Sequence, residues 1–387
     1  MGDVPRATGT EPLGRGVRVS PRAKAEAVRE LSRDEARRLV VRAQLLDAER
    51  PGDIVEVAEQ IFTIKIDPTA TIAPSEQTIA WSRIGWSYES GQLKKAVEQD
   101  RLLFEYDGRF HPASALAARV AQMRTRVFRA QAAGWMAAND RFRADVLARL
   151  RAEGPLIATQ IPDTSQVAHK NEAGWYGSNQ TGRMLELLSY LGEVGIVGRQ
   201  GRQRVWDLGE RVYAGVPEMD AEEASAVLEN RRLQAAGISR QKSPWSGVGM
   251  AGVPVAVEGS SWKWRADPAA LETLDDDPGG RVAILNPYDG FLFDRPRLKE
   301  LFEFEYVLEQ FKPKAQRVYG YFAHPILVGD RFAALLDAEL DKPKENLVVT
   351  AVHELADLDA DEREMVDAEL RDLAEWLGVG LTFAAER

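Results

Sequence analysis

The chain has 387 residues, a formal net charge of −10, 44% hydrophobic and 28% charged residues, and no cysteine, which is typical of a globular protein with several domains. The lack of cysteine excludes thiol nucleophiles, disulfides, iron–sulfur clusters and cysteine-bound zinc, and the four histidines lack the spacing of a metal site. Because there is no phosphate-binding glycine loop, no signal peptide and no membrane span of roughly 18 apolar residues, we expect a cytoplasmic protein without metal or cofactor.

The charge is distributed unevenly along the chain. Residues 1–250 carry 35 Lys and Arg against 32 Asp and Glu, whereas residues 251–387 carry 15 against 28. Nine arginines and only four acidic residues fall within 101–150. A local basic face can contact nucleic-acid phosphates whatever the net charge, because neutralising phosphates releases their counterions. The pattern permits a polyanionic partner, although solvated arginines on helix surfaces also explain it.

The first elements of the chain indicate an arm followed by a mixed domain. Residues 1–30 are polar and aperiodic, which predicts a flexible arm. A helix is predicted next, because Ser32 and Glu35 form a capping-box pattern and apolar residues then recur at helical spacing. The alternating run FTIKID at 62–67 predicts a short strand. We expect 31–143 to form an N-terminal winged-helix-like domain that contains this strand.

The order of elements in 144–215 is that of a winged helix, a helix-turn-helix variant that docks on DNA or on proteins. Shorter helices lead to one at 181–195, and a hairpin follows whose Gln200-Gly201 turn suits a positive φ. The recognition helix and the wing would contact phosphates, and such contacts fix register on DNA rather than read bases. The basic residues concerned are Lys170, Arg183, Arg199, Arg202 and Arg204.

Two further units are predicted in the second half of the chain. Residues 216–275 repeat the helix, loop and strand order in shortened form and are interpreted as a third winged-helix-like unit. Residues 280–387 hold several β-leaning runs, such as YVLEQF at 306–311, and acidic helices near 360–377. The predicted fold class is α+β, with tandem winged-helix domains and a small C-terminal antiparallel β domain.

A series of short motifs occurs along the chain. In chain order they are KIDPT (65–69), WSRIG (81–85), FEY (104–106), GPL (154–156), GWYG (174–177), RVWDLGERV (204–212), LNPYD (285–289) and a long run at 291–331. Together they resemble the motifs of the AlkZ/YcaQ-like family, the winged-helix DNA glycosylases of bacterial crosslink and alkylation repair. The resemblance covers roughly residues 35–350. It implies tandem winged helices and a C-terminal β unit around a concave DNA-binding surface.

The resemblance also implies an activity and its residues. The activity is hydrolysis of the N-glycosidic bond of bulky or crosslinking N-alkylpurines in double-stranded DNA, and we expect a monomer associated with the nucleoid. The family's catalytic triplet, Gln-apolar-Asp or Gln-apolar-Gln, aligns with Lys65-Ile66-Asp67, so lysine replaces the first glutamine. The family's EYWAHEA run becomes EYDGR at 105–109, without its Trp and His. The implied catalytic residues are Asp67 and Lys65.

Asp67 and Lys65 suit different roles. N7 alkylation makes the purine a cationic leaving group, so the enzyme needs a carboxylate that stabilises the oxocarbenium-like sugar and orients or deprotonates water. Asp67 could do both. Because residues i and i+2 of a strand share a face, Lys65 and Asp67 are expected side by side. Lys65 could keep Asp67 ionised, attack the sugar as a Schiff-base nucleophile, or form a structural ion pair on an inactive strand.

Other functions stay open at this stage. A winged-helix protein that binds DNA without chemistry would show the same salt-sensitive binding but release no base. A protein-docking module would not bind DNA. Asp289, Asp294 and Glu305 also permit a carboxylate metal site of a nuclease, although the context of Asp289 matches the glycosylase scaffold better. Trp81, Trp86 and Tyr88 could stack on an unpaired base, but aromatic residues at such spacing more often belong to the core.

Overall fold

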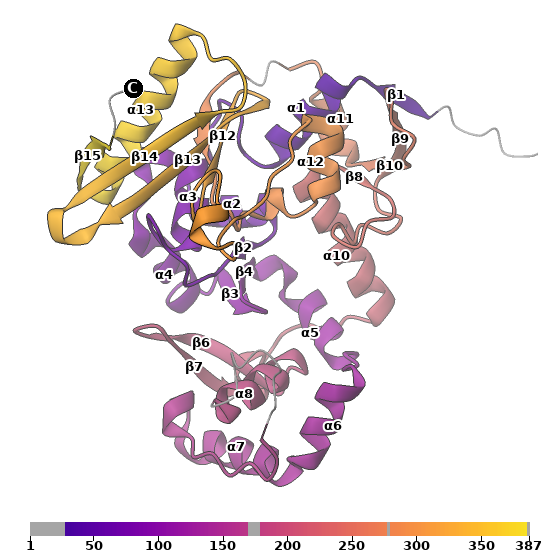
Figure 1. Cartoon of the computed structure of the whole chain (residues 1–387). Coiled ribbons are helices and arrows are strands. Elements are labelled where there is room, and N and C mark those ends of the chain that lie inside the picture. The colour runs from indigo at the N-terminus through magenta and orange to yellow at the C-terminus, as the bar shows by residue number, and fades with distance from the viewer. Residues whose placement is uncertain (1–27, 169–178, 277–278, 385–387) are drawn as a thin grey trace, which may run out of the picture.

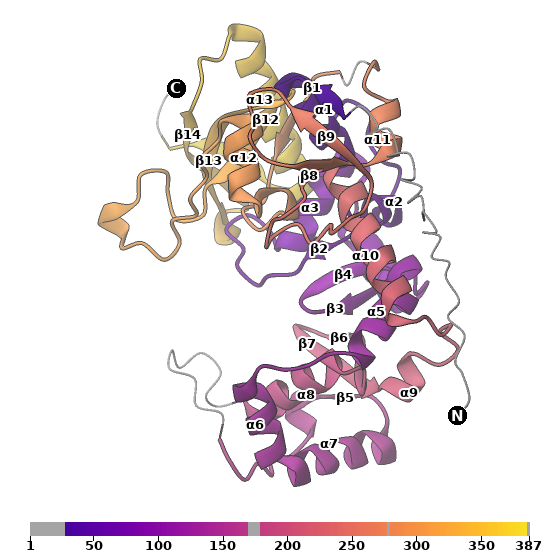
Figure 2. The same cartoon turned by 90° about the vertical axis from the view of Figure 1, so that its right-hand side faces the viewer.

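The computed structural model of the protein describes residues 28–168, 179–276 and 279–384. In Figures 1 and 2 the described residues form a larger upper lobe and a smaller lower lobe. The lower lobe is built from residues 130–212. The lobes are linked through the helix that precedes this segment and the chain that follows it. None of the helices in the described ranges combines the length and apolar character needed to cross a membrane.

The N-terminal part of the upper lobe is mostly helical. Its helices are α1 (Arg33–Ala43), α2 (Ile54–Ile61), α3 (Ser75–Ile84), η1 (Gly85–Ser87), α4 (Ser90–Glu98), η2 (Ala113–Ala115) and α5 (Leu116–Arg124). The predicted capping box of α1 is confirmed, since the Ser32 hydroxyl accepts from the Glu35 amide and the Glu35 carboxylate accepts from the Ser32 amide. An antiparallel sheet lies beside these helices in the order β2 (Ile64–Lys65), β4 (Arg109–Pro112) and β3 (Leu103–Tyr106).

The strand predicted over 62–67 is shorter than the sequence pattern indicates. Phe62 ends α2 with a φ of 67° and a buried ring, so β2 begins only at Ile64. Asp67 lies beyond the end of β2, where its Oδ1 accepts a hydrogen bond of 2.9 Å from the Thr69 amide. A local turn, rather than a strand ladder, therefore orients the Asp67 carboxylate.

The lower lobe contains the helices and the hairpin predicted within 144–215, and it also takes in residues 130–143, which are expected in the N-terminal domain but pack into the core of this lobe through Trp135 and Phe142. Its elements are α6 (Ala130–Ala138), α7 (Asp140–Glu153), β5 (Leu156–Ile157), η3 (Ala158–Gln160), α8 (Gln180–Tyr190), β6 (Val194–Gln200), β7 (Gln203–Leu208) and α9 (Gly209–Val212). The sheet order is β5-β7-β6, and all pairs are antiparallel. Gly201 has a φ of 60° at the tip of the hairpin, as the turn prediction requires.

The segment expected to form a third winged-helix-like unit is not self-contained. It provides α10 (Ala221–Ala236), β8 (Ile238–Arg240), β9 (Val253–Val257), β10 (Trp264–Ala266) and α11 (Pro268–Glu272). The sheet order is β1-β9-β10-β8, in which β1 (Arg29–Leu31) pairs in parallel with β9. Residues 29 and 30 therefore belong to a strand and not to the predicted arm. The physical reason is that β1 satisfies the free edge of β9 and fully buries Leu31.

The C-terminal part of the upper lobe is a five-stranded sheet covered by a helix. Its elements are β11 (Val282–Ile284), η4 (Gly290–Leu292), α12 (Arg295–Phe302), η5 (Lys314–Gln316), β12 (His324–Val328), β13 (Arg331–Asp341), η6 (Lys342–Lys344), β14 (Asn346–Glu354), α13 (Ala360–Leu377) and β15 (Gly380–Phe383). The strands follow one another in spatial order and are antiparallel, except that β15 runs parallel to β14.

The β-leaning run at 306–311 does not form a strand. The buried Glu309 carboxylate accepts hydrogen bonds from the amides of Val318 at 2.7 Å and Tyr319 at 2.9 Å. These bonds close the chain into a loop, so no sheet neighbour is available to this segment.

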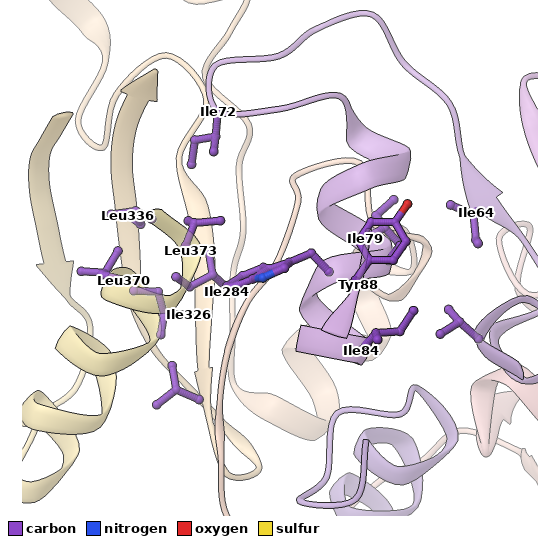
Figure 3. Packing of buried hydrophobic residues seen from close by; sticks show 14 of the residues in the cluster. Ile64, Ile72, Ile79, Ile84, Tyr88, Ile284, Ile326, Leu336, Leu370 and Leu373 are labelled. Atoms are coloured by element: carbon purple, nitrogen blue, oxygen red, sulfur yellow. The ribbon is translucent and has the colours of Figure 1, made fainter. Parts of the chain in front are cut away.

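The largest core joins the N-terminal helices to the C-terminal sheet and α13. Figure 3 shows Ile79 and Ile84 facing Ile284, Ile326 and Leu370 across this core, and Ile64 of β2 is also buried in it. The aromatic residues weighed for base stacking are mostly core, since Trp81 and Tyr88 are buried and stack on Trp376, whereas Trp86 is exposed. β2 is thus attached to a well-packed scaffold.

Candidate active site and nucleic-acid interface

Asp67 lines a cleft of about 600 Å³ between the two lobes. The upper wall comes from residues 66–76, between β2 and the first turn of α3, and from residues near η6. The lower wall comes from α8 and the β6–β7 hairpin and holds Arg183, Arg199, Arg202 and Arg204. The structure therefore brings together Asp67 and the predicted phosphate-contacting arginines. Lys170 lies outside the described residues.

The position of Asp67 follows from its neighbours in the chain. Ile64 is fully buried in the main core, and the Ile66 amide donates a 2.9 Å hydrogen bond to the Gly108 carbonyl oxygen. The half-buried Asp67 follows directly, with Oδ1 bonded to the Thr69 amide. The carboxylate is consequently held at the cleft wall while its second oxygen makes no hydrogen bond to the described residues.

Glu105 of β3 holds two of the hairpin arginines. Its side chain is 1% exposed and receives Arg199 Nη2 at 2.8 Å and Arg204 Nε at 2.5 Å. The Arg199 amide also donates to Glu98 Oε1 of α4 at 3.0 Å. Since β6 lies against β3, these contacts fasten the hairpin to the upper lobe. Glu105 thus engages both arginines, and the cations that line the cleft still outnumber its carboxylates.

The other two arginines of the cleft are less constrained. Arg183 Nη1 lies 3.7 Å from Glu186, with which Arg204 also forms a contact of 3.5 Å. The exposed Arg202 side chain has no ion pair or hydrogen bond with the residues that the structure describes. Of the four, Arg202 is therefore the residue whose guanidinium can meet a phosphate without breaking an internal contact.

Replacing Arg202 with alanine is expected to weaken duplex binding and to lower the slope of log K against log salt by about 0.9, the contribution of one phosphate contact. Fluorescence anisotropy at several salt concentrations measures both effects. The matched control is Arg141→Ala, because Arg141 is also exposed on the lower lobe but lies outside the cleft. Equal slopes for both variants would argue against a phosphate contact by Arg202.

Lys65 does not share the cleft with Asp67, contrary to the expectation from strand alternation. Its Nζ donates to the Ile66 carbonyl at 2.8 Å and to the Gly108 carbonyl at 3.4 Å, and the residue lines a separate hollow. The reason is that β2 ends at Lys65, so the alternation does not extend to Asp67. Burial, and then the charge of Arg109, lowers the pKa of Lys65.

Glu76 is a second carboxylate of the cleft that sequence reasoning missed. It lies in the first turn of α3, and burial raises its pKa. The hydrogen bond from its own backbone amide and the positive charge of Arg199 act in the other direction and lower that pKa, but burial has the larger effect. An acidic residue in the first turn of a helix is so common that the sequence alone offers no signal for this role. The cleft thus contains Asp67 and a carboxylate that favours its neutral form more strongly than usual.

The carboxylates weighed as nuclease ligands have other partners. Asp289 forms a buried ion pair with Arg83, and Asp294 pairs with Arg240. Glu305, which belongs to the same hypothesis, pairs with Lys299. Within the described ranges no group of three or more His, Asp or Glu residues is arranged to hold a metal ion.

Two comparisons with known proteins bear on this site. The sequence profile of the DNA glycosylase AlkZ-like family matches residues 58–376. The structure is similar to that of Streptomyces sahachiroi DNA glycosylase AlkZ, with a TM-score of 0.60 at 15% sequence identity, over 92% of this chain and 100% of the other. At this identity the structural similarity shows a common fold. The profile match spans most of the chain, including Asp67 and the hairpin arginines.

Proposed function

Because the chain belongs to the AlkZ-like DNA glycosylase family, we propose that it is a DNA repair enzyme that hydrolyses the N-glycosidic bond of bulky or crosslinking N-alkylpurines. The observation that carries this proposal is the position of Asp67 in a cleft opposite four arginines. The arginines would hold the phosphates of a duplex, and the carboxylate would stabilise the cationic sugar and orient the attacking water. The lower lobe would act as a winged helix, with α8 and the β6–β7 hairpin on the DNA.

The direct test is incubation of the protein with a duplex that contains N7-alkylguanine, followed by mass-spectrometric detection of the free base. An undamaged duplex of the same sequence is the control. Base release that depends on the protein supports the glycosylase proposal. Salt-sensitive binding without base release would contradict it and favour a DNA-binding protein that has lost the chemistry, and no binding at low salt would favour a protein-docking module.

The inactive alternative has one specific observation in its favour. By the resemblance, lysine stands at Lys65 where the family has its first catalytic glutamine. The pairing of Arg199 and Arg204 with Glu105 does not separate the two interpretations, because under either one these side chains would have to leave Glu105 before they hold a phosphate. If this alternative is correct, the cleft binds duplex DNA mainly through Arg183 and Arg202, with no change in the substrate.

Lys65→Gln is expected to release base at the wild-type rate or up to about tenfold faster, because it removes a cation that opposes the developing positive charge of the sugar. The position of Lys65 in another hollow supports a role outside the bond-breaking step. Single-turnover rates measure the effect, and borohydride treatment should trap no protein–DNA adduct. Loss of activity together with an adduct in the wild type would instead identify Lys65 as a Schiff-base nucleophile.

A further inference from the structure

A separate hollow of about 320 Å³ is lined by an unusual number of cations. Lys65 comes from β2, and the arginines come from β4, α5, α10 and α12, so the chain brings together residues that are far apart in sequence. We call this hollow the arginine pocket, and its cations are Lys65, Arg109, Arg119, Arg232 and Arg297. Convergence of so many like charges is unfavourable unless something compensates them.

Several polar atoms of the arginine pocket are buried without a partner. Arg119 Nε, Arg297 Nε, Ser239 Oγ and His111 Nδ1 have no hydrogen bond to the described residues, although each residue is at most 8% exposed. A buried polar atom left unsatisfied costs roughly 1–3 kcal/mol, and folded proteins rarely leave several together. These atoms belong to four different elements, α5, α12, β8 and β4, which the fold brings together around the pocket. They form a ready-made set of hydrogen-bonding groups for a ligand.

The acidic residues of the pocket neutralise this charge only in part. Asp289 pairs with Arg83, and Asp294 pairs with Arg240. Asp107 lies 3.7 Å from Arg109, and its other oxygen accepts from the Tyr190 hydroxyl at 3.0 Å. The remaining cations of the pocket make no ion pair within the part of the chain that the structure describes; they are Lys65, Arg119, Arg232 and Arg297.

The pKa values of the pocket residues are consistent with this surplus of positive charge. Burial, and then the charge of Arg232, lowers the pKa of Arg119 to about 10. Burial, and then Arg119, lowers the pKa of His111 well below its usual value, so its imidazole is neutral. His111 Nε2 lies 3.2 Å from the Tyr106 carbonyl, which can only accept, so Nε2 carries the proton and Nδ1 is an acceptor. Among the unpartnered atoms of the pocket, the two arginine Nε–H groups donate, the Ser239 hydroxyl can donate or accept, and His111 Nδ1 accepts.

We propose that the arginine pocket binds a small phosphomonoester. The guanidinium groups and the Ser239 hydroxyl would donate to the phosphate oxygens, and His111 Nδ1 would accept from a ligand hydroxyl. A phosphomonoester carries up to two negative charges, so it matches the surplus of cations better than a singly charged phosphodiester does. The unpartnered atoms also belong to residues so deeply buried that the backbone of a duplex cannot approach them. This inference does not depend on the glycosylase proposal.

Inorganic phosphate is the probe that tests the pocket, with binding measured by calorimetry at constant ionic strength on the full chain. We expect saturable binding, at least tenfold weaker in Arg232→Gln and several-fold weaker in Ser239→Ala. Ser239→Ala removes only an unpartnered hydroxyl, so it leaves the fold intact. The matched control is Arg231→Gln, since Arg231 is the neighbour of Arg232 on α10 but pairs with Glu59 outside the pocket.

Three outcomes would overturn the proposal. The first is the absence of saturable phosphate binding by the wild type. The second is an equal loss of affinity in Arg231→Gln and Arg232→Gln, which would indicate a general charge effect. The third is displacement of phosphate by an undamaged duplex, which would assign the pocket to the DNA backbone. None of these measurements involves base release, so failure of this proposal and failure of the glycosylase proposal are distinguishable.

Discussion

Asp67→Asn is expected to lower the rate of base release by about 10²–10³-fold, equivalent to about 3–4 kcal/mol of lost transition-state stabilisation. The amide cannot offer a negative charge to the sugar cation or accept a proton from water. The asparagine side chain keeps an oxygen that can accept the hydrogen bond from the Thr69 amide, so the turn that orients the side chain should persist. Duplex affinity should therefore remain unchanged. Single-turnover release of N7-alkylguanine measures the rate, and anisotropy measures the binding.

The matched control for this variant is Glu76→Gln. Glu76 is the neighbouring carboxylate of the same cleft, it lies in the first turn of α3, and burial raises its pKa. We expect Glu76→Gln to retain most of the activity. If Glu76→Gln abolished base release while Asp67→Asn retained it, the catalytic carboxylate would be Glu76 and the present assignment would be wrong.

Local features of the chain were predictable from the sequence. The capping box at Ser32, the hairpin turn at Gly201 and the C-terminal helix at 360–377 all follow from interactions within a few residues. The predicted α+β composition is likewise present, because hydrophobic periodicity reports which elements form. Asp67 could be proposed because its neighbours resemble a family motif, and the hairpin arginines because of the order of elements around them.

Features that depend on distant contacts were not predictable. β1 completes a sheet with β9 across more than half of the chain, and no local pattern identifies such an edge. The run at 306–311 has strand-like residues, but its loop is closed by Glu309, whose amide partners lie about ten residues further on. The separation of Lys65 from Asp67 also arises from packing, since β2 ends between them. Each case was decided by tertiary contacts that override local propensity.

Asp289→Ala is expected to lower the free energy of unfolding by about 3–5 kcal/mol. Asp289 and Arg83 form an ion pair whose side chains are 1% and 0% exposed, so the substitution leaves the Arg83 guanidinium charged in the interior. Arg83 would retain only neutral acceptors, such as the Gln44 carbonyl oxygen at 3.1 Å. Urea denaturation measures the loss. A metal-ligand role for Asp289 would instead predict a protein of nearly unchanged stability.

The control is the double variant Arg83→Met/Asp289→Leu, which removes both charges. We expect it to lower the free energy of unfolding by less than Asp289→Ala alone does. A double variant that is less stable than the single one would mean that packing, and not the unpaired charge, dominates the loss of stability.

The ion pair between Arg83 and Asp289 joins WSRIG at 81–85 to LNPYD at 285–289, two motifs that carry the family resemblance. These motifs therefore meet in the core, 206 residues apart in sequence, and hold the N-terminal helices against the C-terminal sheet. The ion pair therefore serves the scaffold, whereas the proposed chemistry depends on Asp67.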